Sequence, residues 1–222
     1  MTPTPRNDTV VRVAYGLITA VLGATLVAQV ILTSDEGRSI VNMFSYFTIQ
    51  SNVLVLVTAA ILTVRPTVSG NVWRPVRLAA LCGITTTGIV YATVIAPYVH
   101  LSGKALLYDY VFHYVVPIAS VLAFVFVGPR LPFRSRDMVF IAWPILWLVY
   151  TMVRAAVAHP VFRGLGETPS RYPYRFLDVD AIPTYEVVLS IVVITIVIIG
   201  LGLGYLWAER RLDARARRTA SH

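Results

Sequence analysis

The sequence predicts an all-α integral membrane protein, a bundle of six transmembrane helices with both chain ends in the cytoplasm. Of its 222 residues, 57% are hydrophobic and 14% are charged, whereas a soluble domain is nearer half apolar and a quarter charged. The apolar residues also fall into runs of about 20, the length that a helix needs to cross roughly 30 Å of hydrocarbon. The whole chain, 1–222, is expected to form one such domain.

Six apolar runs define the expected spans. The first follows Arg6, and its apolar run is too long for a signal peptide. Prolines mark several connections: Pro66 lies between the second and third runs, Pro129 between the fourth and fifth, and Pro173 between the fifth and sixth. We therefore expect helices at about 9–32, 41–64, 76–97, 107–127, 137–158 and 184–207, followed by a basic tail at 208–222.

Single residues add detail to the later spans. Cys82, the only cysteine, falls in the third span, so neither a disulfide framework nor a thiolate metal cluster is expected. Pro117 in the fourth span and Pro144 in the fifth are expected to kink their helices. In the sixth span the pair Gly200 and Gly204 predicts close helix packing, because the surrounding "GLGLG" follows no strand and is a poor phosphate-binding loop.

The basic residues predict the orientation. Most of the 19 arginines and lysines fall before the first span, within 65–77 and 128–136, and in the tail. The remaining connections carry fewer basic residues and most of the acidic ones. The positive-inside rule then places both termini in the cytoplasm. We expect the tail to rest on anionic lipid headgroups and not on nucleic acid, and the preference for arginine over lysine is compatible with a bacterial cytoplasmic membrane.

Polar side chains collect in the outer third of the expected bilayer. In the stretch "FSYFTIQSN" of the second span, Thr48 lies about 10 Å below the outer end, at 1.5 Å per residue. His113 of the fourth span lies at a matching depth. Ser51 and Asn52 share the helix face of Thr48, and Gln50 points elsewhere. Polar stripes on two helices at one depth predict that both face a shared cavity.

Three further polar residues approach this layer. Asp109 is four residues before His113 and shares its helix face, and the fifth span brings Tyr150 and Arg154 to a similar depth. Each type also has an ordinary role: a threonine bonds within its own helix, an amide links helices, an aspartate caps a helix, and an arginine reaches for the interface. The histidines show no metal-ligand spacing, so neither a metal nor another cofactor is expected.

Four pieces of the chain, "FSYFTIQSN", "DYVFHYVVPI", "VYTMVRAAV" and "YPYRFLDVD", resemble the six-transmembrane androgen-induced protein family and its bacterial relatives. The resemblance extends over about 10–207. Animal members are membrane-embedded threonine hydrolases, which cleave esters that join a fatty acid to a hydroxy fatty acid. The resemblance implies Thr48 as nucleophile and His113 as base, and it assigns no role to Arg154 or to the "YPYRFLDVD" loop.

These residues suggest that the chain hydrolyses a lipid ester within the bilayer. His113 would take the proton of Thr48 as that oxygen attacks the ester carbonyl. Asp109 would either orient the imidazole ring or cap its helix. The alternative is a non-catalytic membrane protein, which binds or moves a lipid or small amphiphile in the same outer-leaflet cavity.

The remaining candidates would assist this reaction. Asn52 is the first candidate donor to the tetrahedral intermediate, with Gln50 and Ser51 as alternatives. Arg154 and Tyr150 are candidates for anchoring a polar group of the substrate, with its acyl chain among the apolar helices.

Overall fold

The chain folds as a helical bundle whose helices are long enough to cross a membrane. A computed structural model describes residues 8–163 and 169–219. Over these residues the only β-structure is an isolated antiparallel bridge between Phe162 and Ser170. The six candidate spans are Asp8–Asp35, Phe47–Val64, Trp73–Tyr98, Gly103–Val127, Ser135–Ala158 and Thr184–Arg215. The predicted all-α bundle of six membrane-spanning helices is confirmed, and the protein is an integral membrane protein.

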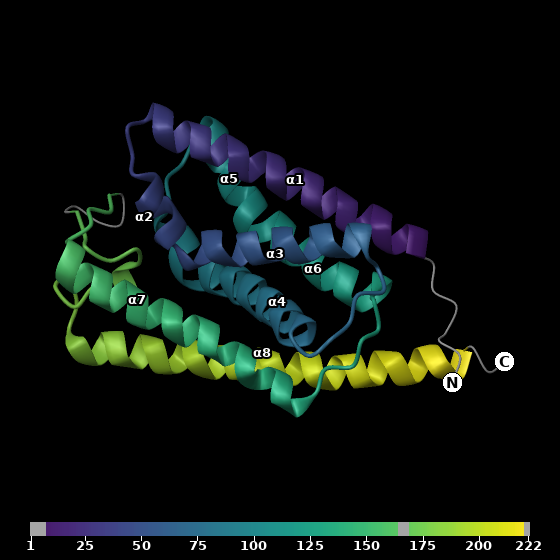
Figure 1. The fold of residues 1–222 in the computed structure, drawn as a ribbon. Coiled ribbons are helices and arrows are strands. Elements are labelled where there is room, and N and C mark those ends of the chain that lie inside the picture. The colour runs from purple at the N-terminus through teal and green to yellow at the C-terminus, as the bar shows by residue number, and fades with distance from the viewer. Residues whose placement is uncertain (1–7, 164–168, 220–222) are drawn as a thin grey trace.

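The described residues form eight α-helices, and all but α2 contribute to these spans. They are α1 (Asp8–Asp35), α2 (Ile40–Ser45), α3 (Phe47–Val64), α4 (Trp73–Val90), α5 (Gly103–Tyr110), α6 (Val116–Leu122), α7 (Ala142–Ala158) and α8 (Thr184–Thr219). π-Helical turns occupy Tyr91–Ile95, Val111–Val115 and Ala123–Val127, and 3-10 helices occupy Ala96–Tyr98, Ser135–Ile141 and Arg175–Leu177. The start of α1 and the end of α8 lie at the same end of the bundle (Figure 1).

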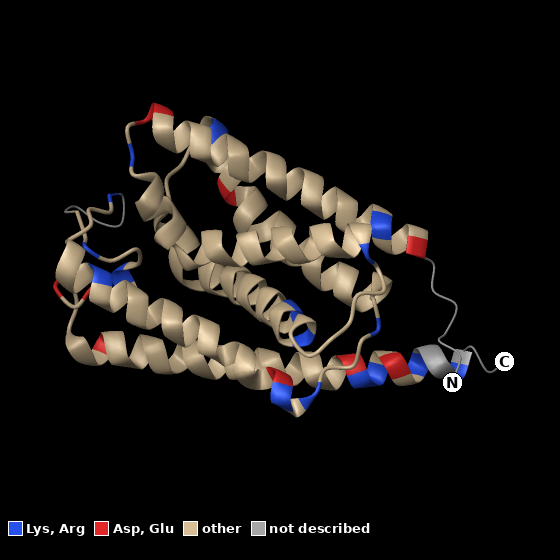
Figure 2. Cartoon of the chain, in the orientation of Figure 1, with Lys and Arg blue, Asp and Glu red and all other residues tan. Residues whose placement is uncertain are grey.

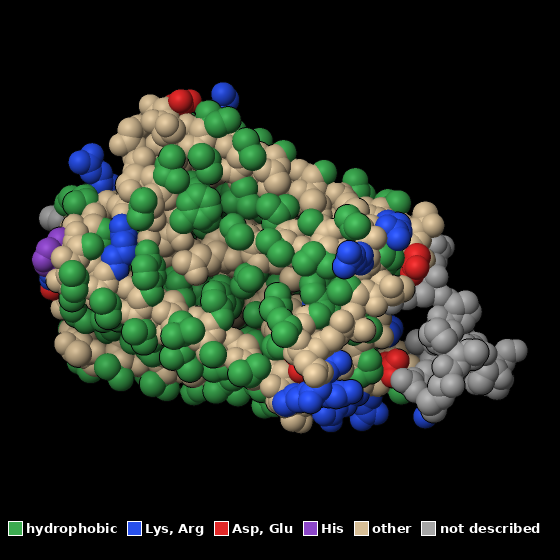
Figure 3. Space-filling view, viewed as in Figure 1, with side chains coloured by type: hydrophobic (Ala, Val, Ile, Leu, Met, Phe, Trp, Pro, Cys, Tyr) green, Lys and Arg blue, Asp and Glu red, His purple; other side chains and the backbone are tan. Residues whose placement is uncertain are grey.

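The core forms along α3 and α4. Helix α3 packs against α1 and α4, and α4 also packs against α6 and α8. Leu22, Val55 and Ile84 are buried in one cluster, and Leu78 and Phe124 in a second. Hydrophobic side chains also cover the outer faces of the helices (Figure 3), where lipid is the solvent. Charged residues gather towards the two ends of the bundle (Figure 2).

A glycine brings α4 close to the helix that carries His113. A Cβ atom on Gly88 would lie 3.0 Å from Cβ of Pro117 and 3.4 Å from the carbonyl oxygen of His113. The missing side chain therefore permits α4 to approach the fourth span at this level. The approach places Tyr91, the first residue after α4, beside the imidazole.

The second span differs from its prediction, because two helices replace the single expected helix at 41–64. Helix α2 ends at Ser45, and Tyr46 adopts an extended conformation with φ −67° and ψ 133° before α3 begins at Phe47. The break lies next to Thr48. The sequence did not indicate this break, because the hydrophobic run continues through it and neither a proline nor a glycine marks the position.

The sixth span also continues further than predicted. Helix α8 runs to Thr219, so the described part of the expected tail, 208–219, forms its last turns. The prediction of close packing at Gly200 and Gly204 was wrong, since a Cβ on either residue would meet no atom within 4 Å. Gly202 makes the close contact instead, because its Cβ would lie 2.8 Å from Cε1 of Phe140 and 3.0 Å from Sδ of Met138.

Candidate active site

The break in the second span places Thr48 at the start of a helix inside the bundle. Thr48 is the second residue of α3, and its N–H therefore has no carbonyl partner within that helix. Helix α7 stabilises the break: Trp147 Nε1 donates to the Ser45 carbonyl at 3.0 Å, and the Tyr150 hydroxyl lies 3.1 Å from Ser45 Oγ. The N-terminus of α3 thus lies inside the bundle, beside a threonine hydroxyl.

The structure brings together Thr48 and His113, the two residues expected at one depth. Thr48 Oγ1 lies 3.3 Å from His113 Nε2. His113 Nδ1 faces two acceptors, the Asp109 carbonyl oxygen at 2.9 Å and Asp109 Oδ1 at 3.0 Å. Because Nδ1 faces only acceptors, it carries the proton in the neutral ring. The lone pair of Nε2 then points at the Thr48 hydroxyl.

Tyr91 completes the surroundings of the imidazole. Its ring stacks on that of His113 with centroids 3.7 Å apart and an interplanar angle of 16°. Its hydroxyl donates to Asp109 Oδ2. Asp109 therefore accepts from both aromatic residues, one at each carboxylate oxygen. Tyr91 and His113 both lie on π-helical turns, which are frequent at functional sites because they displace side chains from the regular helical register.

Tyr174 is a site residue that sequence reasoning missed. The Thr48 N–H donates to the Tyr174 hydroxyl at 3.2 Å, and Thr48 Oγ1 lies 3.3 Å from the same oxygen. Burial raises the pKa of the Tyr174 phenol, and the hydrogen bonds from Thr48 offset only part of that rise. The hydroxyl therefore keeps its proton and can donate it to a hydrogen bond. The "YPYRFLDVD" piece contained this signal, since its aromatic density is unusual for an exposed loop.

The loop that carries Tyr174 is anchored by its own polar residues. Ser170 Oγ donates to Asp178 Oδ2 at 2.6 Å, and the N–H of Asp180 donates to Asp178 Oδ1 at 3.0 Å. The Tyr174 ring stacks on Phe176 at 5.1 Å and meets Tyr46 edge-on at 5.5 Å. These contacts hold the phenol against the break in the second span.

Of the three predicted donors near Thr48, Asn52 and Gln50 are bonded to other groups and Ser51 has no partner in the described part of the chain. Asn52 is fully buried, and its Nδ2 donates to the carbonyl oxygens of Thr48 at 2.9 Å and Phe112 at 3.3 Å. Gln50 Nε2 donates to the Phe44 carbonyl at 3.1 Å. Ser51 is fully buried, and its Oγ has no hydrogen-bond partner among the described residues. Asn52 thus has no N–H left for an oxyanion.

The two predicted anchoring residues lie at the break and not beside Thr48. Tyr150 contacts Ser45, as described above. Arg154 donates to Asn42 Oδ1 at 2.6 Å, and its guanidinium lies 5.8 Å from the ring centroid of Phe162. Asn42 in turn donates to the Val161 carbonyl at 2.8 Å. Arg154 therefore ties α2 to α7 and to the loop after α7.

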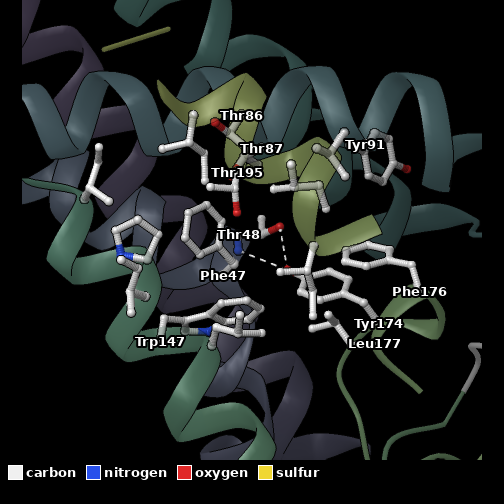
Figure 4. Close-up of a pocket in the computed structure, with 18 of the residues that line it drawn as sticks. Phe47, Thr48, Thr86, Thr87, Tyr91, Trp147, Tyr174, Phe176, Leu177 and Thr195 are labelled. Atoms are coloured by element: carbon white, nitrogen blue, oxygen red, sulfur yellow. Dashed lines mark hydrogen bonds between the residues drawn. The ribbon is translucent and has the colours of Figure 1, made fainter. Parts of the chain in front are cut away.

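A cavity of about 810 Å³, including the part open to the outside, lies against Thr48. Figure 4 shows Thr48, Tyr174 and Trp147 around it, with further threonines on its wall. Ile145 of α7 and Ile199 of α8 line the cavity and are 53% and 38% exposed. The cavity therefore opens between α7 and α8, towards the bilayer.

Among the described residues, no group of three or more His, Cys, Asp or Glu side chains could hold a metal ion. No family model, curated protein or solved structure matches this chain. The resemblance to the six-transmembrane androgen-induced proteins therefore rests on its sequence motifs.

Proposed function

We propose that this protein is an intramembrane hydrolase of lipid esters, with Thr48 as nucleophile and His113 as general base. The observation that carries the proposal is the 3.3 Å approach of His113 Nε2 to Thr48 Oγ1, with Asp109 on the other ring nitrogen. This is the arrangement by which an adjacent base activates a hydroxyl nucleophile. The distance is long for a hydrogen bond, as is common in catalytic pairs without substrate.

Acylation follows from these contacts. His113 Nε2 removes the proton from Thr48 Oγ1 as the oxygen attacks the ester carbonyl carbon, which produces a tetrahedral oxyanion. The resulting imidazolium is stabilised by Asp109 Oδ1. When the intermediate collapses, the ester C–O bond breaks, the leaving alkoxide takes the proton from Nε2, and an acyl-threonine remains. Water, deprotonated by the same nitrogen, then attacks the acyl-threonine and releases the carboxylic acid and the free Thr48 hydroxyl.

The oxyanion would be bound by the Tyr174 hydroxyl. This group lies at the nucleophile, because its oxygen accepts from the Thr48 N–H at 3.2 Å and lies 3.3 Å from Thr48 Oγ1. Donors placed where charge develops are worth most in a site that excludes water. Asn52, the first choice from sequence, is replaced in this role because its amide hydrogens go to two carbonyl oxygens.

The location of the cavity supports a lipid substrate. It opens towards the bilayer between α7 and α8, so an amphiphile can reach Thr48 without leaving the membrane. Its walls are apolar apart from hydroxyl groups, which suits an acyl chain better than a water-soluble ester.

The test is covalent labelling of the detergent-solubilised protein with an alkyl fluorophosphonate, with the modified residue identified by mass spectrometry. We expect the label on Thr48, and its loss in Thr48→Ala and in His113→Ala. Thr58→Ala is the matched control, because Thr58 is a buried threonine of the same helix that bonds to the Leu54 carbonyl. Turnover of p-nitrophenyl palmitate should fall about 10³-fold or more in the first two variants and remain in the control.

The non-catalytic alternative predicts different results. His113 does not line the cavity, which favours a binding role if Thr48 alone meets the ligand. In that case no labelling by the probe would depend on His113. The wild-type protein would also hydrolyse p-nitrophenyl palmitate no faster than the His113→Ala variant does. Lipid would nevertheless co-purify with the protein.

A further inference from the structure

Two threonines of α4 lack the hydrogen bond that other threonines in these spans make. Five threonines in these spans donate to the carbonyl four residues earlier: Thr19, Thr25, Thr58, Thr63 and Thr93. Thr86 and Thr87 are only 3% and 5% exposed, and neither Oγ1 has a partner among the described residues. A buried hydroxyl without a partner is unfavourable. Ser51, Ser120 and Thr151 also carry such hydroxyls, but of these five residues Thr86 and Thr87 are the two that line the cavity next to Thr48.

Both threonines belong to the wall of the cavity beside the nucleophile. Thr86, Thr87 and Thr48 all line it, and Figure 4 labels them among the lining residues. The register of α3 and α4 agrees: a Cβ on Gly83, one turn before Thr87, would lie 3.0 Å from Oγ of Ser51, about one turn after Thr48. Since the two helices run in opposite directions, Thr87 lies at about the level of Thr48.

The cavity contains no charged group that could bind an ion. None of the described residues that line it is Asp, Glu, Lys, Arg or His. A carboxylate or a phosphate placed there would lose its hydration without gaining a counter-charge. Arg154, the basic residue nearest in sequence to the α7 part of the wall, is instead bonded to Asn42. The part of a ligand that enters the cavity is therefore uncharged.

We propose that Thr86 and Thr87 form a polar subsite for an oxygen of an uncharged lipid ester, whose chain occupies the apolar remainder of the cavity. The inference rests on the proposed function, because it names the class of ester that the Thr48 site would cleave. Each hydroxyl donates to the ligand oxygen and so gains the partner that it lacks in the free protein. These hydrogen bonds favour a neutral ester over a hydrocarbon. Because the cavity offers no positive charge, a neutral ester is also favoured over a fatty acid anion.

The test measures binding and not turnover, in a Thr48→Ala background. Trp147 lines the cavity, and bromine atoms on a bound lipid quench tryptophan fluorescence. Three probes of one chain length are compared: dibrominated methyl stearate, dibrominated octadecane and dibrominated stearate at pH 8. We expect the methyl ester to quench at about tenfold lower concentration than the hydrocarbon, the equivalent of about 1.4 kcal/mol from hydrogen bonding. Stearate should quench least.

The Thr86→Val/Thr87→Val variant decides the role of the two hydroxyls. Valine keeps the shape of threonine, so hydrocarbon quenching should stay the same while the tenfold preference for the ester disappears. Because all measurements use the same micelles, probe partitioning cancels between variants. Thr58→Val should retain the preference, and Trp147→Phe should lose most of the quenching signal.

Several outcomes would overturn the inference: equal quenching by ester and hydrocarbon in the parent, an unchanged preference in the double valine variant, or strongest quenching by stearate. Folding provides an independent check. Valine removes hydroxyls without partners, so the ligand-free variant should melt no lower than its parent, and a clear fall would mean that the hydroxyls are already bonded. Failure of the fluorophosphonate test would leave these binding results valid, so the two proposals fail separately.

Discussion

Thr48 is in direct contact with two uncharged polar groups of the candidate site. Its hydroxyl lies between an imidazole nitrogen and a phenol, and its N–H donates to the same phenol. The one acidic group in contact with the imidazole, Asp109, is shared with Tyr91. In a medium where ions are costly, this arrangement needs a full positive charge on His113 only during the reaction, when Asp109 is there to stabilise it.

Replacing Asp109 with asparagine separates its two contacts with His113. The backbone carbonyl, 2.9 Å from Nδ1, still holds the proton on that nitrogen. The imidazolium loses its carboxylate partner. We expect kcat to fall about 10- to 100-fold, less than the roughly 10⁴-fold loss seen when a triad aspartate alone sets the tautomer, with KM little changed. Steady-state hydrolysis of p-nitrophenyl palmitate checks this.

Tyr91→Phe is the matched control for Asp109→Asn, because it removes the second bond to the carboxylate and keeps the ring stack. A smaller loss of kcat is expected. If Asp109→Asn were as inactive as His113→Ala, the carbonyl would not hold the tautomer, and the geometric argument would fail.

Replacing Tyr174 with phenylalanine tests the proposed oxyanion donor. The ring contacts with Phe176 and Tyr46 remain, while the hydroxyl beside Thr48 is lost. We expect kcat to fall about 10²- to 10³-fold, as for other single oxyanion donors, with a much smaller change in KM. Tyr172→Phe, a buried tyrosine of the same loop, should leave both constants near wild type. An unchanged kcat in Tyr174→Phe would assign the hydroxyl a structural role only.

The same tyrosine predicts a dependence of stability on alkaline pH. Burial raises the pKa of Tyr174 in the folded protein above that in the unfolded chain, which is about 10. Its contribution is fully present below that unfolded value and is lost as pH rises towards the folded one, because only the unfolded chain then releases the proton. The melting temperature should therefore fall less steeply between pH 7 and pH 11 for Tyr174→Phe than for wild type. Parallel curves would contradict this.

Breaks in regular helices bring the site together, and these were the features hardest to predict. Six spans and the depth of Thr48 and His113 followed from hydrophobicity and from 1.5 Å per residue. The extended Tyr46 and the π-helical turns at Tyr91 and His113 carry no such signal. They depend on partners distant in sequence, such as Trp147, which donates to the Ser45 carbonyl.

Loop residues could not be placed from the sequence either. Tyr174 lies 126 positions from Thr48, and no pattern within the loop indicates where its hydroxyl points. Asn52 was correctly placed on the face of Thr48, but its donors go to the carbonyls of Thr48 and Phe112, which a helical projection cannot show. Periodicity thus predicts which residues share a face, and tertiary contacts decide which atoms remain free.

The glycines of α8 give a test of helix packing within one helix. Alanine at Gly202 would bring a methyl group to 2.8 Å from Phe140, so we expect a loss of stability of about 1–3 kcal/mol. Alanine at Gly200 or Gly204 meets nothing within 4 Å and should be neutral or stabilising, since alanine favours a helix. Thermal melting in detergent compares the three. If Gly200→Ala and Gly204→Ala proved the damaging changes, that face would pack against another chain.

The position of the site within the bundle gives the orientation a functional meaning. Thr48 is the second residue of α3. The start of α3 lies towards one end of the bundle, and the start of α1 and the end of α8 lie at the other (Figure 1). If both chain ends are cytoplasmic, as the basic residues predict, the cavity opens into the outer leaflet. The substrate would then be a lipid of that leaflet, and the products would be released there.

Cysteine labelling can decide this orientation. The single native cysteine, Cys82, is 1% exposed, and a Cys82→Ala background leaves only introduced thiols. Ser102 precedes the span Gly103–Val127 and Ser135 begins the next span, so these exposed residues lie on opposite sides of the membrane. We expect a membrane-impermeant maleimide to label Ser102→Cys in intact cells, and to label Ser135→Cys only after the membrane is opened. The reverse pattern would place Thr48 and its cavity in the inner leaflet, and the substrate would have to be sought among cytoplasmic-side lipids.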